Sequence, residues 1–199
     1  DFNWDSRLYN ACKGGNVDIV FIILKAKDHE FNWNYGLYGA CEGGNMDVVN
    51  MMISKGADEF NTGLYHASSC NHFDIALHMI EKGANDINPV FDFACKYRKL
   101  NFAKLMIEKG VTDYYFRFKC ACERGDMEIV KLIVSNFDLK ENLKRGFDCA
   151  CAHGQMALVE YFISEGVYDL NDGLENAHTY GHNDIVKLLT RLLIAKNRR

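Results

Sequence analysis

Eight cysteines in a chain of 199 residues are the side chains with the most obvious capacity for chemistry. Cys120 and Cys122, and likewise Cys149 and Cys151, form Cys-x-Cys pairs that resemble half-sites for zinc. However, residues two positions apart on a helix point in different directions, and tetrahedral zinc needs its sulfurs about 2.3 Å from the metal. The pairs therefore indicate structural thiols, and we predict neither a metal site nor a cofactor.

Most of the cysteines share one recurring place, directly after an alanine: Cys12, Cys41, Cys95, Cys122 and Cys151. A cysteine in such a place packs as a small hydrophobic residue. Cys70 is displaced to a more exposed turn, and we expect it to be the most reactive thiol. This use of cysteine for packing favours a reducing, cytoplasmic compartment over an oxidising one.

The histidines do not cluster at spacings from which a nucleophile, a base and an orienting group could be assembled. No Gly-rich phosphate-binding loop appears either. We therefore predict a non-catalytic protein without a small-molecule substrate.

The charge and hydropathy of the chain exclude two further classes of partner. The net charge of −4 argues against a dedicated nucleic-acid binder, which usually presents a basic face. The longest apolar run, Ile19 to Leu24, is too short to span a bilayer. Lys196, Arg198 and Arg199 end the sequence, and we expect these cations to favour the C-terminus of a helix, with a contact to nucleic acid as the alternative.

An internal repeat organises the whole sequence, and one alanine marks its phase: Ala11, Ala40, Ala67, Ala94, Ala121, Ala150 and Ala177. Leu or Phe stands three residues before each marker alanine, and apolar residues dominate eight and nine residues after it. We refer to positions in each repeat by their distance from the marker alanine. The repeats span 1–29, 30–58, 59–85, 86–112, 113–139, 140–168 and 169–199.

Each repeat is typical of a helix–turn–helix unit. The first helix is expected to be short, for example from Gly36 to Glu42, and the second to be longer, with a broad apolar stripe. Gly closes most repeats, for example Gly56, and Asn136 stands in the same role in repeat five. Since no repeat can bury its own apolar face, we predict an all-α solenoid of stacked repeats that forms one domain without internal boundaries.

Repeat one lacks the polar surface expected of a terminal cap. Phe21 stands where other repeats have polar residues, and Lys27 replaces the closing glycine. We therefore expect further repeats upstream of Asp1, or another structure packed against this end.

These signals together resemble the ankyrin repeat. The last repeat resembles it most, with Leu174, Ala177, Gly181-His182 and Ile185-Val186. Ankyrin repeats usually have about 33 residues, whereas these have 27 to 29. The missing residues correspond to the projecting β-hairpin of the family, which we expect to be trimmed to a tight loop. Short repeats of this kind resemble those that giant DNA viruses of amoebae encode.

The resemblance also implies where a partner would bind. In ankyrin repeats, the two residues after the alanine and its small neighbour line a concave groove. Those positions vary here, either as drift on a solvated surface or as a recognition strip, and the strip hypothesis selects these residues: Lys13, Glu42, Ser69, Lys96, Tyr97, Glu123, Arg124, His153, Thr179 and Tyr180. We expect Tyr97 and Arg124 to be the main anchors, and to be dispensable for folding.

Two further sets of residues follow from the resemblance. Trp33 and Tyr115 are predicted to lie in inter-repeat loops and to add apolar contacts with the partner. His72 and His182 are predicted to hydrogen-bond the backbone and so to tie neighbouring repeats together.

The predicted function is a scaffold, monomeric in isolation, that binds a host or viral protein through the groove and the loops. The alternative is a structural component that packs in a virion or another large assembly.

Overall fold

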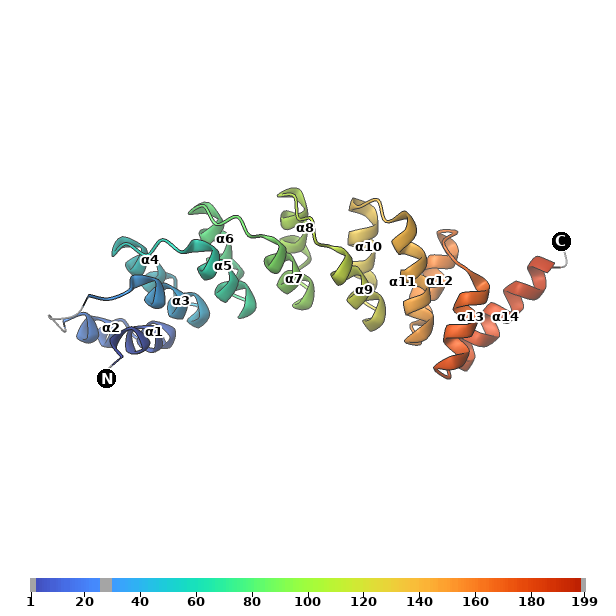
Figure 1. Ribbon diagram of the computed structural model, residues 1–199, viewed down its shortest axis with the longest axis horizontal. Helices are drawn as coiled ribbons and strands as arrows, with labels where there is room; N and C mark the ends of the chain where they lie inside the picture. Colours follow the sequence, from blue (N-terminus) through green and yellow to red (C-terminus); the bar gives the residue numbers. More distant parts are fainter. Residues whose placement is uncertain (1–2, 26–29, 198–199) are drawn as a thin grey trace. The chain divides into compact units, whose positions relative to one another are not determined.

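A computed structural model describes residues 3–25 and 30–197 of the chain, and it is all-α over these residues, without a β-strand (Figure 1). The helices alternate between the first and the second helix of successive repeats. Their bounds are α1 Trp4–Gly14, α2 Val17–Leu24, α3 Trp33–Gly43, α4 Met46–Ser54, α5 Phe60–Ser69, α6 Phe73–Glu81, α7 Asn88–Lys96, α8 Leu100–Glu108, α9 Tyr115–Arg124, α10 Met127–Asn136, α11 Lys140–Ala152, α12 Met156–Ser164, α13 Leu170–Thr179 and α14 Asn183–Asn197. The predicted fold class and the predicted helix pairs are confirmed.

The chain divides into two compact bodies. The N-terminal body, Asp1–Val111, contains the first four repeats, and the C-terminal body, Thr112–Arg199, contains the last three. Within each body the first helix of one repeat packs against the first helix of the next, and each first helix also packs against its own second helix. That the chain forms one domain stays a prediction, and it requires the two bodies to unfold together in one transition.

The core of each body follows the repeat. Every marker alanine after Ala11 is fully buried, as is the Leu or Phe three residues before it in repeats one to six. Burying each of these large side chains is worth roughly 1.5–3 kcal/mol. In repeat seven the equivalent Leu174 is only half-buried. The apolar face that a single repeat cannot cover is thus covered by its neighbours, as the sequence predicted.

The relative lengths of the two helices differ from the prediction. The second helix is longer than the first only in repeat seven, and α3, for example, has 11 residues where α4 has 9. The reason is local capping. The side chain of Asn32 accepts a hydrogen bond from the backbone N–H of Asn34, so that α3 begins at Trp33 rather than at Gly36.

Asn136 does not close its helix in the way that was predicted. It is the last residue of α10, and the next residue, Phe137, is extended rather than left-handed. The Asn136 side-chain amide donates to the Leu132 carbonyl at 2.8 Å and so satisfies a terminal acceptor directly. The expectations for Lys27, Arg198 and Arg199 lie outside the described residues.

Side chains organise the short loops between repeats. The side-chain Oδ1 of Asn34 accepts from the backbone N–H groups of Asp58 and Glu59 at 2.9 and 3.1 Å. Asn61, at the same repeat position, accepts from the N–H groups of Asn85 and Asp86 at 2.8 and 3.0 Å. These bonds satisfy loop donors that a β-hairpin would pair with another strand. The trimmed loops predicted from the repeat length are confirmed.

Candidate functional site

One face of the N-terminal body gathers aromatic and charged side chains from its four first helices, α1, α3, α5 and α7. We call this set the N-terminal strip; it consists of Tyr9, Lys13, Tyr38, Glu42, Tyr65, His66, Ser69, Phe93, Lys96 and Tyr97. Five of these residues, Lys13, Glu42, Ser69, Lys96 and Tyr97, were selected from the sequence. The other five residues stand one or two positions before a marker alanine, whereas the resemblance placed the groove only after it.

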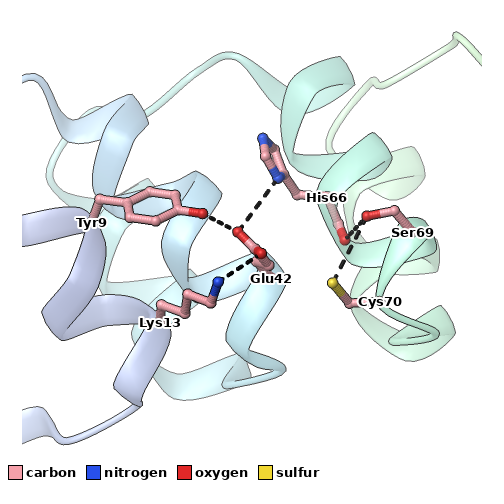
Figure 2. A network of polar contacts seen from close by, with 6 residues as sticks. All are labelled: Tyr9, Lys13, Glu42, His66, Ser69 and Cys70. Carbon is pink, nitrogen blue, oxygen red and sulfur yellow. Dashed lines mark hydrogen bonds and ion pairs between the residues drawn. The ribbon is translucent and has the colours of Figure 1, made fainter. Parts of the chain in front are cut away.

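Glu42 is the centre of a polar network that joins three repeats (Figure 2). The Tyr9 hydroxyl donates to Glu42 Oε2, and Lys13 Nζ lies 2.7 Å from Glu42 Oε1. His66 Nδ1 lies 3.8 Å from Glu42 Oε2. Because α1, α3 and α5 each contribute to it, the network fixes their side chains relative to one another.

The network shifts the protonation equilibria of its members. The hydrogen bond from Lys13 lowers the pKa of Glu42, and the same bond raises the pKa of Lys13. Burial lowers the pKa of His66, and Glu42 opposes this shift only in part. Glu42 is therefore held ionised while His66 is biased toward its neutral form.

Aromatic rings continue the strip beyond the network. The Tyr38 ring stacks on His66 with centroids 5.5 Å apart, and its hydroxyl donates to Glu59. Burial and this bond raise the pKa of Tyr38 to about 12. Tyr65 is 50% exposed and meets the edge of Phe93 with centroids 5.5 Å apart. Half of the Tyr65 side chain is thus accessible at the surface of the strip.

Tyr97 has a structural role that the sequence did not indicate. Its hydroxyl donates to the Ser69 carbonyl at 2.5 Å, and its ring contacts Phe73 and Phe93. Lys96 Nζ lies 5.3 Å from the centre of the Tyr97 ring. The prediction that Tyr97 is dispensable for folding stays a prediction, although this half-buried ring makes contacts between repeats three and four.

The cysteines lie where the sequence placed them. The five thiols that follow a marker alanine are buried, whereas Cys70 is half-buried at the end of α5, 3.8 Å from Ser69 Oγ. Burial raises the pKa of Cys12, Cys41 and Cys151 to about 12. These buried thiols are consequently poor nucleophiles.

The C-terminal body places its predicted residues at the ends of α9, α11 and α13, with His153 and Tyr180 directly after their helices. Arg124, Thr179 and Tyr180 are exposed, with Tyr180 at 64%. Glu123 Oε1 lies 3.9 Å from Lys119 Nζ. The His153 ring lies 2.9 Å from the Cys149 carbonyl within its own repeat. Their role in binding stays a prediction.

The two aromatic residues assigned to loops lie in helices instead. Trp33 is in the first turn of α3, half-buried, with its ring 5.5 Å from that of Phe31. Tyr115 begins α9 and is also half-buried, while its neighbour Phe116 is 53% exposed. The loop assignment was wrong because both residues follow a helix cap directly.

Side chains at position +5 tie neighbouring repeats together at their turns. His182 Nε2 lies 2.9 Å from the Ala152 carbonyl, as predicted. Asn45 and Gln155 make the equivalent bonds, donating to the carbonyls of Gly15 at 3.1 Å and Glu123 at 2.8 Å. Among the described residues, the His72 ring makes no such bond, although it packs against Gly44.

A surface pocket of about 550 Å³ lies at the turns of repeats three and four. It is lined by Asn71, Phe73, Arg98, Lys99, Leu100, Asn101 and Phe102, and we call it the turn pocket. None of these residues was selected as a site from the sequence. The available signal was at position +4, where five repeats have Gly but repeats three and four have Asn71 and Arg98.

A comparison with protein families finds a match within the N-terminal repeats. Residues 8–90 match the family of ankyrin repeats in three copies. This match covers helices α1 to α6 and the start of α7, including most of the N-terminal strip. No curated protein matches the chain. Ankyrin repeats are in general protein–protein interaction modules, which is the coarse function that the match supports.

Two further features of the structure concern metal binding and membrane insertion. Over residues 3–25 and 30–197, no three His, Cys, Asp or Glu side chains are grouped so that they could hold a metal ion. Within the same ranges, no helix has both the length and the apolar character needed to cross a bilayer.

Proposed function

We propose that the chain is a non-catalytic interaction module that binds a protein through the N-terminal strip. The resemblance of its short repeats to those of giant DNA viruses implies a host or viral protein as the partner. The observation that carries the proposal is the row of aromatic side chains on α1, α3, α5 and α7, with Tyr65 half-exposed among them. A few residues carry most of the binding energy of a protein interface, and Tyr is enriched among them.

Charge supports the same surface. Lys13 and Lys96 are exposed at the two ends of the strip, and Glu42 lies between them in an ion pair with Lys13. Mixed charges around aromatic anchors favour a specific partner, because a wrong partner leaves charges unpaired. The residues of the C-terminal body, Arg124, His153, Thr179 and Tyr180, extend the proposal as secondary contacts.

The test compares capture by matched variants of the full chain. The strip variant Tyr65→Ser with Lys96→Glu changes two accessible side chains, and the control Tyr168→Ser changes an exposed aromatic residue of the other body that is not among the predicted contacts. Extracts of the source cell are passed over each immobilised protein and retained proteins are quantified by mass spectrometry. We expect a partner retained by the wild type and the control but reduced about ten-fold by the strip variant.

Equal retention by the strip variant would overturn the strip as the binding surface. Melting curves of all three proteins exclude a loss of folding as the cause. Calorimetry with the purified partner then measures the affinity directly.

A second candidate, assembly into a larger particle, is favoured by the apolar surface of α2. Ile19, Phe21 and Ile22 of α2 are 47%, 49% and 69% exposed, whereas Val48, the equivalent of Ile19 in repeat two, is fully buried. Such an apolar face is typical of end-on packing. Sedimentation of the wild type and of Ile22→Asp distinguishes this candidate, because assembly through α2 would be lost in the variant while a monomeric binder would be unchanged.

A further inference from the structure

The turn pocket combines an apolar floor with a cationic rim. The rings of Phe73 and Phe102, from the first turns of α6 and α8, lie with their centroids 4.7 Å apart and form the floor. Arg98 and Lys99 are exposed at the rim, and no acidic residue is among the residues that line the pocket. A volume of about 550 Å³ is within the range of specific ligand sites.

The backbone of the pocket departs from the other repeats. Position +4 is left-handed in every repeat, and Gly fills it in five of the seven. The two exceptions are Asn71 with φ 69° and Arg98 with φ 56°. They are in adjacent repeats, and both line this pocket. A side chain in this conformation costs free energy that glycine avoids, and such costs concentrate at functional sites.

The charge of the turn is also reversed in repeat four. Repeat two has Gly44-Asn45-Met46-Asp47 at positions +4 to +7, with a formal charge of −1. Repeat four has Arg98-Lys99-Leu100-Asn101 at the same positions, with a formal charge of +2. The first turn of α8 accordingly has no acidic residue, whereas that of α4 has Asp47. The turn pocket is thus a local cationic site on a chain with a net charge of −4.

We propose that the turn pocket binds an acidic peptide segment of the protein partner. A large apolar side chain of the segment packs against Phe73 and Phe102, and neighbouring carboxylates pair with Arg98 and Lys99. Asn71 and Asn101 supply amide groups for the peptide backbone. This inference rests on the proposed function, because the pocket adjoins the N-terminal strip at Tyr97, whose ring contacts Phe73.

The composition of the pocket favours a peptide over other anions. A free phosphate ion would use the two cations and leave the apolar floor uncovered. A nucleic acid needs cations along several successive phosphates, and only Arg98 and Lys99 are cationic among the lining residues. An apolar side chain next to carboxylates uses both parts of the pocket.

The test replaces the turn of repeat four by the turn of repeat two in the full chain. The turn-swap variant Arg98→Gly, Lys99→Asn and Asn101→Asp removes both cations and restores glycine at the left-handed position. Asn at the helix cap matches Asn45, whose side chain accepts from the Val48 N–H at 3.0 Å. We therefore expect this variant to fold with an unchanged or higher melting temperature. The floor variant Phe73→Met and Phe102→Val places the residues of repeat two at the floor.

The probe is a displayed library of random nonapeptides selected on the wild-type chain. We expect the enriched peptides to carry acidic residues beside a large apolar residue. Fluorescence anisotropy of a labelled enriched peptide should show an affinity about ten-fold lower for either variant, and a decrease with added salt.

Three outcomes would overturn the inference. The first is the enrichment of peptides without acidic residues. The second is an equal affinity of the enriched peptide for the wild type and the turn-swap variant. The third is displacement of the peptide by a thymidine decamer at equal charge concentration, which would indicate nucleic-acid binding. The proposed function is tested separately: if the strip variant loses the captured partner while the turn-swap variant keeps it, the strip stands and the peptide site falls.

Discussion

The first helices of the two bodies build different surfaces on the same scaffold. In the N-terminal body each repeat has an aromatic residue one or two positions before the marker alanine: Tyr9, Tyr38, Tyr65 and Phe93. In the C-terminal body the same positions hold Lys119-Cys120, Asp148-Cys149 and Glu175-Asn176. One surface is aromatic around a charged centre, and the other is charged and small.

The electrostatics differ in the same way. Glu42 is held ionised by Lys13, Tyr9 and His66 from neighbouring repeats. In the C-terminal body, Asp148 Oδ1 is buried without a hydrogen-bond partner among the described residues, and burial and the nearby Asp172 raise the pKa of Asp148. Lys144 pairs instead with Asp169 and Asp172, at 3.2 and 2.9 Å. The same helix–turn–helix pattern thus holds a hydrogen-bonded carboxylate, Glu42, in one body and a carboxylate oxygen without a hydrogen bond, on Asp148, in the other.

The largest expected effect concerns how closely α1 and α3 approach in the N-terminal body. A Cβ atom added at Gly39 would meet the backbone carbonyl of Tyr9, whereas one added at Gly14 meets nothing within 4 Å. Gly39→Ala should therefore destabilise the protein by roughly 3 kcal/mol, and the control Gly14→Ala should stabilise it by up to about 1 kcal/mol. Urea denaturation followed by circular dichroism measures both, and a stable Gly39→Ala would contradict the close approach.

The next largest effect is expected in the C-terminal body. Ala121 is fully buried between helices, so Ala121→Leu should overpack the core and cost about 1–3 kcal/mol. Ala157 on α12 is exposed and serves as the control for the same substitution. An unchanged melting curve would be incompatible with the repeat assignment at Ala121. The number of transitions tests the single-domain prediction, since a shift in one of two transitions would mean that the bodies unfold separately.

A smaller effect should distinguish two tyrosines of the predicted recognition strip, the half-buried Tyr97 and the exposed Tyr180. Tyr97→Phe removes the hydrogen bond to the Ser69 carbonyl and should cost about 1 kcal/mol of stability. Tyr180→Phe alters a largely exposed residue and should leave the free energy of unfolding unchanged. Equal stability of both variants in urea would show that Tyr97 acts only at the surface.

The smallest effect is the dependence of stability on pH, which should have one sign for His66 and Glu42 in the N-terminal body and the opposite sign for Asp148 in the C-terminal body. The lowered pKa values of His66 and Glu42 mean that their stabilisation is present above the unfolded pKa values of about 6.5 and 4.3 and is lost as the pH falls. The raised pKa of Asp148 means that its contribution is present below an unfolded pKa of about 3.9 and is lost as the pH rises.

The measurement is the free energy of unfolding at pH 7 and pH 5 for the wild type and two variants. His66→Gln should flatten the loss of stability between these values, and Asp148→Asn should raise stability at pH 7. Identical pH profiles for the wild type and His66→Gln would refute the assignment of His66 to the network.

Much of the fold was predictable because it depends on residue size and period. The marker alanines and the residues before them are buried because a solenoid needs the same contact in every repeat. The helix starts were missed although their signal was present, since Asn3 and Asn32 are good helix caps and each directly precedes a Trp. Half of the N-terminal strip was predicted, from its variability after the marker alanine.

The sequence by itself determined the all-α fold class, the phase and number of the repeats, the buried thiols and the trimmed loops, because these follow from a short pattern repeated along the chain. Only the tertiary structure decided which variable side chains meet. Tyr9, Glu42 and His66 come from three repeats, and Asn71 and Arg98 from two, and their contacts depend on the spacing and rotation between neighbouring helices. A repeat pattern states that such helices are neighbours, but only packing sets which atoms face one another.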